Sequence, residues 1–240
     1  MKKFALKDII FLVVVVLLVA AVVTLSVLLA LQKKKAKEEA PSYYDQKCAA
    51  FALENANFSS GQIVFIGDSI TDGYRLSDYF LDLPLAVYNR GIGGDVTSGM
   101  YDRLKTSLYD LAPSKIVLLI GINDINSGRK NDEILSNYTA ILGAIKEHLP
   151  TAEVTCLSVL PMSSRVEAWG IDLAKTTEQI KSLNAEIEPL AASYGYNYLD
   201  LFSLVSDENE RLIEAYTYDG LHLNADGYAI WTAAIKPYLQ

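Results

Sequence analysis

The stretch IVFIGDS, residues 63–69, begins a pattern that the rest of the chain repeats. Its first four residues are apolar, and they stop at glycine, aspartate and serine, which is typical of a buried strand that ends in a turn. Similar apolar runs follow at residues 86–89, 116–120, 154–160 and 198–201. Longer amphipathic stretches, with the spacing of helices, lie at residues 97–111, 132–148, 172–192 and 225–238. This alternation predicts an α/β fold with a five-stranded parallel sheet between layers of helices.

Small and polar residues follow each of the first three predicted strands. They are Gly-Asp-Ser at 67–69, RGIGGD at 90–95 and GIND at 121–124. Ligands of such sheets bind at the carboxyl ends of the strands. Three separate turns therefore bring polar groups to one edge, which predicts an active site there.

The chain has two histidines, and only one of them has a promising neighbour. His148 lies at a predicted helix end, where a cation suits the helix dipole, so we expect a structural role. His222 follows Asp219 by three residues, close enough for the carboxylate to bind Nδ1 and leave Nε2 to accept a proton. This spacing also occurs by chance and identifies no site by itself.

On the polar turns, three residues are candidates for a nucleophile and for donors to an oxyanion: Ser69, Gly94 and Asn123. Ser69 would present its hydroxyl and its backbone N–H at the sheet edge, and Gly94 and Asn123 would add a backbone and a side-chain donor for an oxyanion. Each also has a structural reading as a turn or capping residue. Asp95 is expected to cap the helix at 97–111, and Asp124 to hold its loop. The Gly-x-Ser-x-Gly elbow of α/β-hydrolases is absent around Ser69.

Taken in order, four blocks resemble those of the SGNH (GDSL) hydrolases. They are GDSIT (67–71), NRGIGGD (89–95), GIND (121–124) and DGLH (219–222). Each block is short, but their order and gaps make the combination specific, and the resemblance extends over residues 62–240. It implies a flavodoxin-like three-layer α/β/α sandwich with a five-stranded parallel sheet.

The resemblance also implies roles for individual residues. Ser69 would be the nucleophile, His222 the general base and Asp219 the acid that orients it. Ser69, Gly94 and Asn123 would form the oxyanion hole, and no metal or cofactor is required. The wording of the first two blocks is more similar to the branch of platelet-activating-factor acetylhydrolase-like proteins and carbohydrate acetylesterases than to long-chain thioesterases. It implies hydrolysis of a small acyl ester, acetyl, on a carbohydrate.

Three other functions stay open. A lysophospholipase or thioesterase would need an apolar groove, for which Tyr74, Tyr79, Phe80 and Trp169 are candidates, although ordinary packing explains them equally well. Acyl transfer to a sugar would use the same triad. A non-catalytic binding module would be expected to lack a member of the site, and all are present.

Residues 9–31 form a run of 23 residues without a charge. About 20 apolar residues cross the ~30 Å hydrocarbon core, whereas the apolar core of a cleaved signal peptide is ~7–15 residues long. We therefore expect an uncleaved transmembrane anchor, with a signal peptide as the alternative. The predicted organisation is a tail at 1–8, the anchor at 9–31, a tether at 32–60 and the hydrolase domain at 61–240.

The charges of the chain do not decide on which side of the membrane the catalytic domain lies, but they indicate the kind of partner it binds. Three lysines precede the apolar run and four follow it closely, so the positive-inside rule does not decide the orientation. A short tail before an anchor is the usual layout of an exported domain, which favours an extracytoplasmic catalytic domain. Residues 38–240 hold 14 basic and 28 acidic residues, a net charge of −14. Such a domain is a poor partner for nucleic acid and suits a neutral small-molecule or glycan ester.

The two cysteines fit no zinc-site spacing. Cys156 lies in an apolar run and is expected in the core. A disulfide between Cys48 and Cys156 stays open, and the oligomeric state has no signal in the sequence.

Overall fold

The computed structural model describes residues 6–39 and 41–240. The chain divides into two compact units, Met1–Ser42 and Tyr43–Gln240. The segment 32–60, predicted to be a charged tether followed by a short helix, extends over both units. Its first residues continue a long helix that reaches Glu39, and its second half holds helix α2 (Tyr43–Asn55), which belongs to the unit with the sheet.

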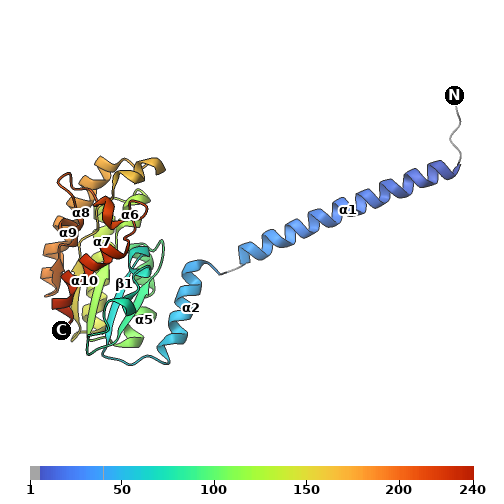
Figure 1. Cartoon of the computed structure of the whole chain (residues 1–240). Helices are drawn as coiled ribbons and strands as arrows, with labels where there is room; N and C mark the ends of the chain where they lie inside the picture. Colours follow the sequence, from blue (N-terminus) through green and yellow to red (C-terminus); the bar gives the residue numbers. More distant parts are fainter. Residues whose placement is uncertain (1–5, 40) are drawn as a thin grey trace. The chain divides into compact units, whose positions relative to one another are not determined.

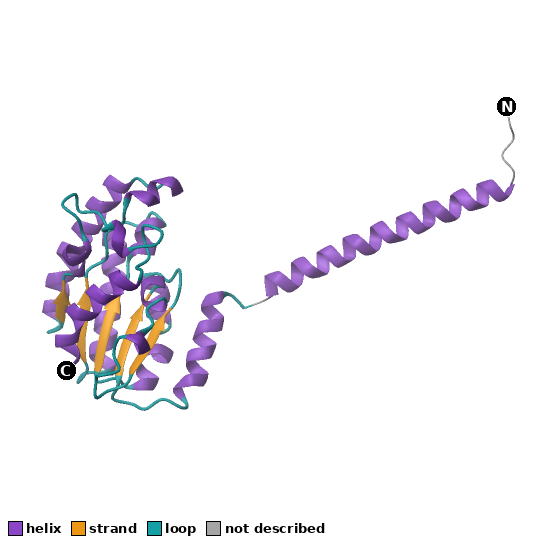
Figure 2. Ribbon diagram, in the orientation of Figure 1, coloured by secondary structure: helices purple, strands orange, loops and turns teal. Residues whose placement is uncertain are grey.

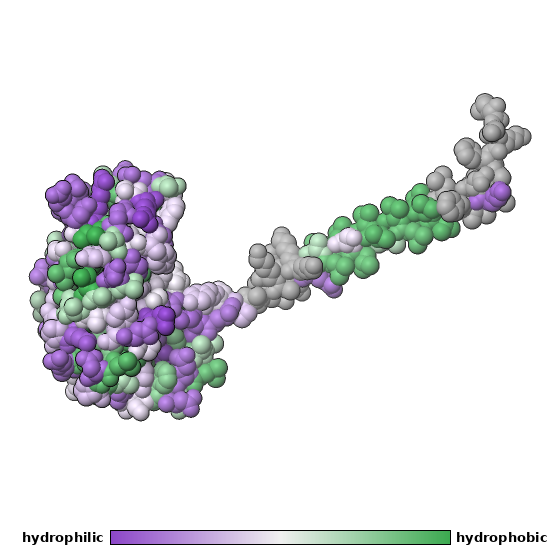
Figure 3. All heavy atoms as spheres, in the orientation of Figure 1, coloured by the Kyte–Doolittle hydropathy of each residue, from purple (hydrophilic) through white to green (hydrophobic). Residues whose placement is uncertain are grey.

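The first unit contains a single described helix, α1 (Leu6–Glu39). Within the described residues, its segment Val14–Gln32 is the one stretch long and apolar enough to cross a membrane, a test that a signal sequence also passes. Figure 3 shows this segment as a nearly continuous apolar surface. The hydroxyls of Thr24 and Ser26 donate to the carbonyls of Ala20 and Val22, both at 2.9 Å, so the two polar side chains are satisfied inside the helix.

The second unit is built on a parallel sheet with the strand order β2-β1-β3-β4-β5 (Figure 2). The strands are β1 (Ile63–Gly67), β2 (Val87–Gly91), β3 (Lys115–Leu119), β4 (Glu153–Leu157) and β5 (Asn197–Leu199). All five lie within two or three residues of their predicted positions. They form because mainly apolar runs are stable where both faces of a sheet are covered, and β1, which has no charged residue, is buried along its whole length.

Helices cover the sheet in the flavodoxin-like three-layer sandwich that the resemblance implied (Figure 1). They are α2, α3 (Ser69–Asp72), α4 (Thr97–Asp102), α5 (Leu104–Ser107), α6 (Ile122–Asn126), α7 (Asn131–His148), α8 (Leu173–Ser193), α9 (Leu201–Val205) and α10 (Ala225–Leu239). Short 3-10 turns are η1 (Leu76–Asp78), η2 (Tyr109–Leu111), η3 (Ser164–Trp169) and η4 (Glu214–Tyr216). Phe65 of β1 packs against Trp231 of α10, with ring centroids 6.1 Å apart. α7 packs against α4 and α8.

The predicted helix at 97–111 was wrong as a single element. It breaks at Arg103 (φ −105°, ψ 8°) into α4, α5 and η2. The side chain of Arg103 is buried and binds partners near the sheet edge, so the chain bends there. Asp95 does not cap this helix either. The N-cap is Val96, and Asp124 from another loop accepts the N–H of Thr97 at 2.9 Å.

Two smaller expectations are answered by the fold. Cys48 and Cys156 are both free, and Cys156 is buried in β4. His148 is the last residue of α7, where its Nδ1 lies 3.0 Å from the carbonyl oxygen of Ala144 and its ring stacks on Tyr109. His148 therefore has the structural role that its position predicted.

Candidate active site

The register of the sheet brings three loops together. Gly67 at the end of β1 pairs with Gly91 at the end of β2 and with Leu119 at the end of β3. The residues that follow each strand therefore leave the sheet at one level. This is the edge at which the sequence placed its candidate site.

A tight turn places Ser69 at this edge. Ser69 is the first residue of α3, and the carboxylate of Asp68 caps the helix by accepting the N–H of Ile70 at 2.9 Å. A Cβ at Gly67 would lie 2.1 Å from Oγ1 of Thr71 and 2.5 Å from the carbonyl oxygen of Leu119. Only glycine fits there, and its absence of a side chain lets the helix begin directly above the strand.

His222 and Asp219 lie opposite Ser69 on one compact loop. Nε2 of His222 is 2.9 Å from Oγ of Ser69, and Nδ1 of His222 is 2.6 Å from Oδ2 of Asp219. Thr217 fastens the loop, since its hydroxyl donates to the carbonyl of His222 at 2.7 Å and accepts the N–H of Gly220 at 2.8 Å. The structure thus brings these three predicted residues into one hydrogen-bonded chain.

The environment of Asp219 favours its ionised form. Partial burial raises the pKa of Asp219, but hydrogen bonds from the ring of His222 and from the N–H groups of His222 and Leu221 outweigh burial, so the pKa lies below its usual value. An ionised carboxylate beside Nδ1 holds that nitrogen as the N–H. Nε2 is then the acceptor that faces the hydroxyl of Ser69.

Gly94 lies on the loop after β2, and Asn123 lies in the first turn of α6, after β3. Gly94 has φ +79°, a left-handed conformation that glycine adopts without strain, and a Cβ there would meet nothing within 4 Å. Glycine is therefore needed at position 94 for its backbone conformation, since a larger side chain would have room there. The amide nitrogen of Asn123 donates to the carbonyl of Asp95 at 2.9 Å. This bond ties α6 to the loop that carries Gly94 and uses one of the two N–H groups of the Asn123 amide.

A buried arginine under the site was missed by the sequence analysis. Arg103 donates to the carbonyls of Gly67 and Arg90, at 2.9 and 2.7 Å, and pairs with Asp95 at 2.8 Å. It thereby joins the ends of β1 and β2 to the loop that carries Gly94. The available signal was its helical position, three residues after Met100 on an otherwise apolar stripe.

Asp68, directly before Ser69, is the most perturbed carboxyl of the site. Its side chain is 1% exposed, and its Oδ2 has no hydrogen-bond partner among the described residues. Burial raises the pKa of Asp68 to about 7, against the opposing effect of the Ile70 N–H. Asp124, in contrast, binds Thr97 and Arg129 and holds its loop, as expected.

Two hollows lie among the chain neighbours of the candidate residues, although Ser69, Asp219 and His222 do not line either one. One, of about 370 Å³, is lined by Tyr44, Gly94 and Val96 among others. The second, of about 270 Å³, is lined by three tyrosines, Tyr79, Tyr218 and Tyr228, and by polar residues. The ring of Tyr218 lies nearly parallel to that of His222, with centroids 5.8 Å apart.

Only one of the four aromatic residues considered for a lipid groove lines these hollows, and it is Tyr79. Tyr74 and Phe80 are buried in the core, and Trp169 is half-exposed at the end of η3. Within residues 6–39 and 41–240, no three His, Cys, Asp or Glu side chains are grouped to hold a metal ion.

Comparison with known proteins gives consistent relatives. The family model described as "GDSL-like Lipase/Acylhydrolase family" matches residues 65–230. Platelet-activating factor acetylhydrolase IB subunit alpha2 of Homo sapiens is 29% identical over 173 residues, which cover 70% of this chain and 71% of that protein.

Solved structures agree with the family match. A Streptococcus pneumonia protein, provisionally named a platelet activating factor, is 30% identical with a TM-score of 0.78, over 88% of this chain and 99% of that one. A GDSL-like lipase from Bacteroides thetaiotaomicron is 26% identical with a TM-score of 0.72, over 82% and 98%.

Proposed function

Because the chain belongs to the GDSL-like lipase/acylhydrolase family and is a carboxylic ester hydrolase, we propose that it removes a small acyl group, acetyl, from a carbohydrate ester with Ser69 as nucleophile. The observation that carries the proposal is the hydrogen-bonded chain from Asp219 through His222 to Ser69, with contacts of 2.6 and 2.9 Å.

The chain of contacts supports a two-step hydrolysis. Oγ of Ser69 attacks the ester carbonyl while Nε2 of His222 takes its proton, and Asp219 stabilises the imidazolium. The imidazolium then protonates the leaving alcohol. In the second step Nε2 takes a proton from water, the hydroxide attacks the acyl-serine, and the acid leaves as the proton returns to Oγ.

The developing oxyanion needs donors in the same space. The N–H groups of Ser69 and Gly94 and the free N–H of the Asn123 amide are the proposed donors. They follow β1, β2 and β3, whose ends the register of the sheet brings to one level. Fixed donors of this kind stabilise the transition state more than the substrate.

A small acyl group is supported by two observations. The matched curated relatives are named acetylhydrolases. The hollow lined by Gly94 and the hollow lined by Tyr218 have volumes of about 370 and 270 Å³, near the lower end of ligand sites, which suits an acetyl group and one sugar unit better than a long enclosed chain.

A carbohydrate alcohol is supported by the second hollow. Tyr79, Tyr218 and Tyr228 offer aromatic faces, and Arg75 and Asp78 offer charged hydrogen-bonding groups. This combination matches a sugar ring, which has an apolar face and a rim of hydroxyls. The net negative charge of the chain also suits a neutral substrate.

The test is hydrolysis of p-nitrophenyl esters from acetate to palmitate by the full-length chain in neutral detergent micelles, beside Ser69→Ala. We expect turnover limited to short chains and lost by at least ~10⁴-fold in the variant. Screening of acetylated xylan and acetylated peptidoglycan fragments then addresses the alcohol. Preference for long chains would replace the proposal by a lipid acyl hydrolase, and activity that survives Ser69→Ala would remove Ser69 from its role.

We also propose that residues 9–31 are an uncleaved anchor that holds the catalytic unit outside the cytoplasm. The length and composition of Val14–Gln32 support a span. Protease added to intact cells should degrade the catalytic unit, and the full-length chain should stay with membranes in alkaline carbonate. Protection from the protease would reverse the orientation, and release of a shortened soluble chain would indicate a signal peptide.

A further inference from the structure

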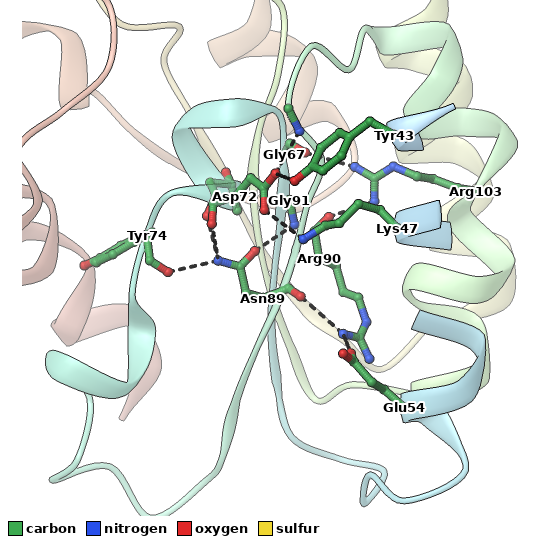
Figure 4. A network of polar contacts seen from close by, with 12 residues as sticks. Tyr43, Lys47, Glu54, Gly67, Asp72, Tyr74, Asn89, Arg90, Gly91 and Arg103 are labelled. Atoms are coloured by element: carbon green, nitrogen blue, oxygen red, sulfur yellow. Dashed lines mark hydrogen bonds and ion pairs between the residues drawn. The ribbon is translucent and has the colours of Figure 1, made fainter. Parts of the chain in front are cut away.

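Two side chains of helix α2 bind the carboxylate of Asp72, beside the candidate active site. Its Oδ2 accepts from the hydroxyl of Tyr43 at 2.6 Å and from the N–H of Gly93 at 3.0 Å. Its Oδ1 accepts from Nζ of Lys47 at 2.8 Å. Tyr43 and Lys47 lie on successive turns of α2, and both side chains point toward Asp72 in Figure 4.

Asp72 is close to the reacting groups along the chain and in space. It is the last residue of α3, which begins with Ser69, and its acceptor Oδ2 holds the residue directly before Gly94. A Cβ built on Gly93 would lie 3.4 Å from the ring of Tyr43, 3.6 Å from Oδ2 of Asp72 and 3.9 Å from Cβ of Ser69. The nucleophile helix, the glycine loop and α2 therefore meet at Gly93.

The other contacts of α2 hold it in place independently of Asp72. Tyr44 donates to the carbonyl of Gly99 at 2.7 Å, and Asn55 donates to that of Thr106 at 2.7 Å. Arg90 of β2 pairs with Glu54 at 2.8 Å. With both of its ends bound, α2 is a fixed support from which Tyr43 and Lys47 reach the site.

The carboxylate of Asp72 is well placed to orient a backbone group. Its side chain is 17% exposed and that of Lys47 is 26% exposed, so their 2.8 Å ion pair is largely sheltered from water. The hydrogen bond to Asp72 raises the pKa of Tyr43 to about 12, which keeps the phenol a donor at every pH used in an assay. The carboxylate of Asp72 therefore accepts hydrogen bonds from Tyr43, Lys47 and Gly93 together, and these three bonds fix its orientation.

We propose that Asp72 is a positioning residue that sets the Gly93–Gly94 loop for oxyanion binding, and that Tyr43 and Lys47 of α2 hold Asp72 for this task. The inference rests on the proposed function, because it takes Gly94 as an oxyanion donor. It makes α2, which precedes the family match at residues 65–230, a part of the active site. Without the hydrogen bond from Gly93 to Asp72, the Gly93–Gly94 loop can rotate, and the N–H of Gly94 then no longer points at the oxyanion.

The test is steady-state kinetics of the full-length chain in micelles on p-nitrophenyl acetate, with Asp72→Ala, Asp72→Asn and Tyr43→Phe. Removing an oxyanion donor costs ~10²–10³ in kcat, so misaligning one should lower kcat by about 10- to 100-fold for Asp72→Ala. KM should change by less than about threefold, since the interaction acts in the transition state. Tyr43→Phe keeps the ring and loses one hydrogen bond, so a smaller loss of kcat, about 3- to 10-fold, is expected.

A double-variant cycle separates positioning from general packing. If Tyr43 acts through Asp72, then Tyr43→Phe added to Asp72→Ala, which leaves no acceptor for the phenol, should lower kcat no further. Independent effects that multiply would overturn the proposal, as would a kcat within threefold of wild type in Asp72→Ala, or a loss confined to KM. Asp82→Asn, which removes a surface ion pair with Lys236, is the matched control and should leave kcat unchanged.

Failure of the positioning role of Asp72 can be distinguished from failure of the proposed function. Ser69→Ala in the same assay reports on that function alone. If Ser69→Ala abolishes turnover while Asp72→Ala does not change kcat, only the positioning role is refuted. Thermal unfolding followed by tryptophan fluorescence shows whether each variant is folded at the assay temperature. Tyr43→Phe keeps the test decisive if Asp72→Ala is not.

Discussion

Replacing Asp68 by asparagine should change how the stability of the protein depends on pH. Asp68 is 1% exposed, and burial raises its pKa from 3.8 to about 7. Between these two values the folded protein holds a proton on Asp68 that the unfolded chain lacks. The contribution of Asp68 to the free energy of unfolding of the wild type therefore falls as pH rises from 4 to 7. The asparagine of the variant carries no such proton and keeps an oxygen for the N–H of Ile70.

The magnitude follows from the size of the pKa shift. Roughly three pH units at about 1.4 kcal/mol each amount to about 4 kcal/mol. The unfolding free energy of Asp68→Asn minus that of the wild type should thus grow by up to about 4 kcal/mol between pH 4 and pH 8. Other groups with shifted pKa values are present in both proteins, so the difference isolates Asp68.

Urea unfolding of the full-length chain in neutral micelles, followed by tryptophan fluorescence at several pH values, measures this difference. Both tryptophans lie in the catalytic unit, and Trp231 is fully buried. Asp132→Asn, at an exposed position in the first turn of α7, is the control and should show no such trend. A difference that stays within about 1 kcal/mol over the pH range, or grows toward acid, would mean that Asp68 is ionised in the fold.

Three further changes test the site and the core. Asp219→Asn should lower kcat by about 10⁴-fold, because the amide neither holds the tautomer of His222 nor stabilises its cation; a loss below tenfold in ester kinetics would contradict this. Asn123→Ala should lower kcat by about 10²–10³-fold with little change in KM, and a rise in KM alone would show that the amide binds substrate and not the oxyanion. Trp231→Ala should lower the unfolding free energy by about 3–5 kcal/mol, since the ring is fully buried against Phe65; a loss below 1 kcal/mol in urea would show that the core refills the space.

The sheet was predictable because its three central strands are buried along most of their length. Such strands are continuous apolar runs, and their polar carboxyl-terminal turns stand out against them. The GDSIT, NRGIGGD, GIND and DGLH blocks could be placed in order without the structure, and the family match confirms the resemblance that they carried. The contact between Ser69 and His222 followed only from the resemblance, since 153 residues separate them.

The features that sequence reasoning missed depend on distant partners. The break at Arg103 is caused by acceptors on two strand ends and by Asp95, which a local helical pattern does not contain. Asp72 drew no attention because an aspartate near a helix end is commonplace. Its partners on α2 lie 25 and 29 residues earlier, in a stretch predicted to be a charged tether followed by a short helix.

The loop from Thr217 to Leu223 carries both His222 and Asp219, and an antiparallel bridge between its two ends closes it. Their mutual geometry is thus set mainly within seven consecutive residues, with added support from the N–H of Ser163, which donates to the carbonyl of Gly220 at 2.8 Å. The distance from His222 to Ser69, in contrast, depends on how the last third of the chain packs against β1. In the proposed mechanism Asp219 and His222 form a preassembled module, and the packing of the core places this module against Ser69. Gentle warming should therefore inactivate the enzyme by parting this module from Ser69 while the module itself stays assembled.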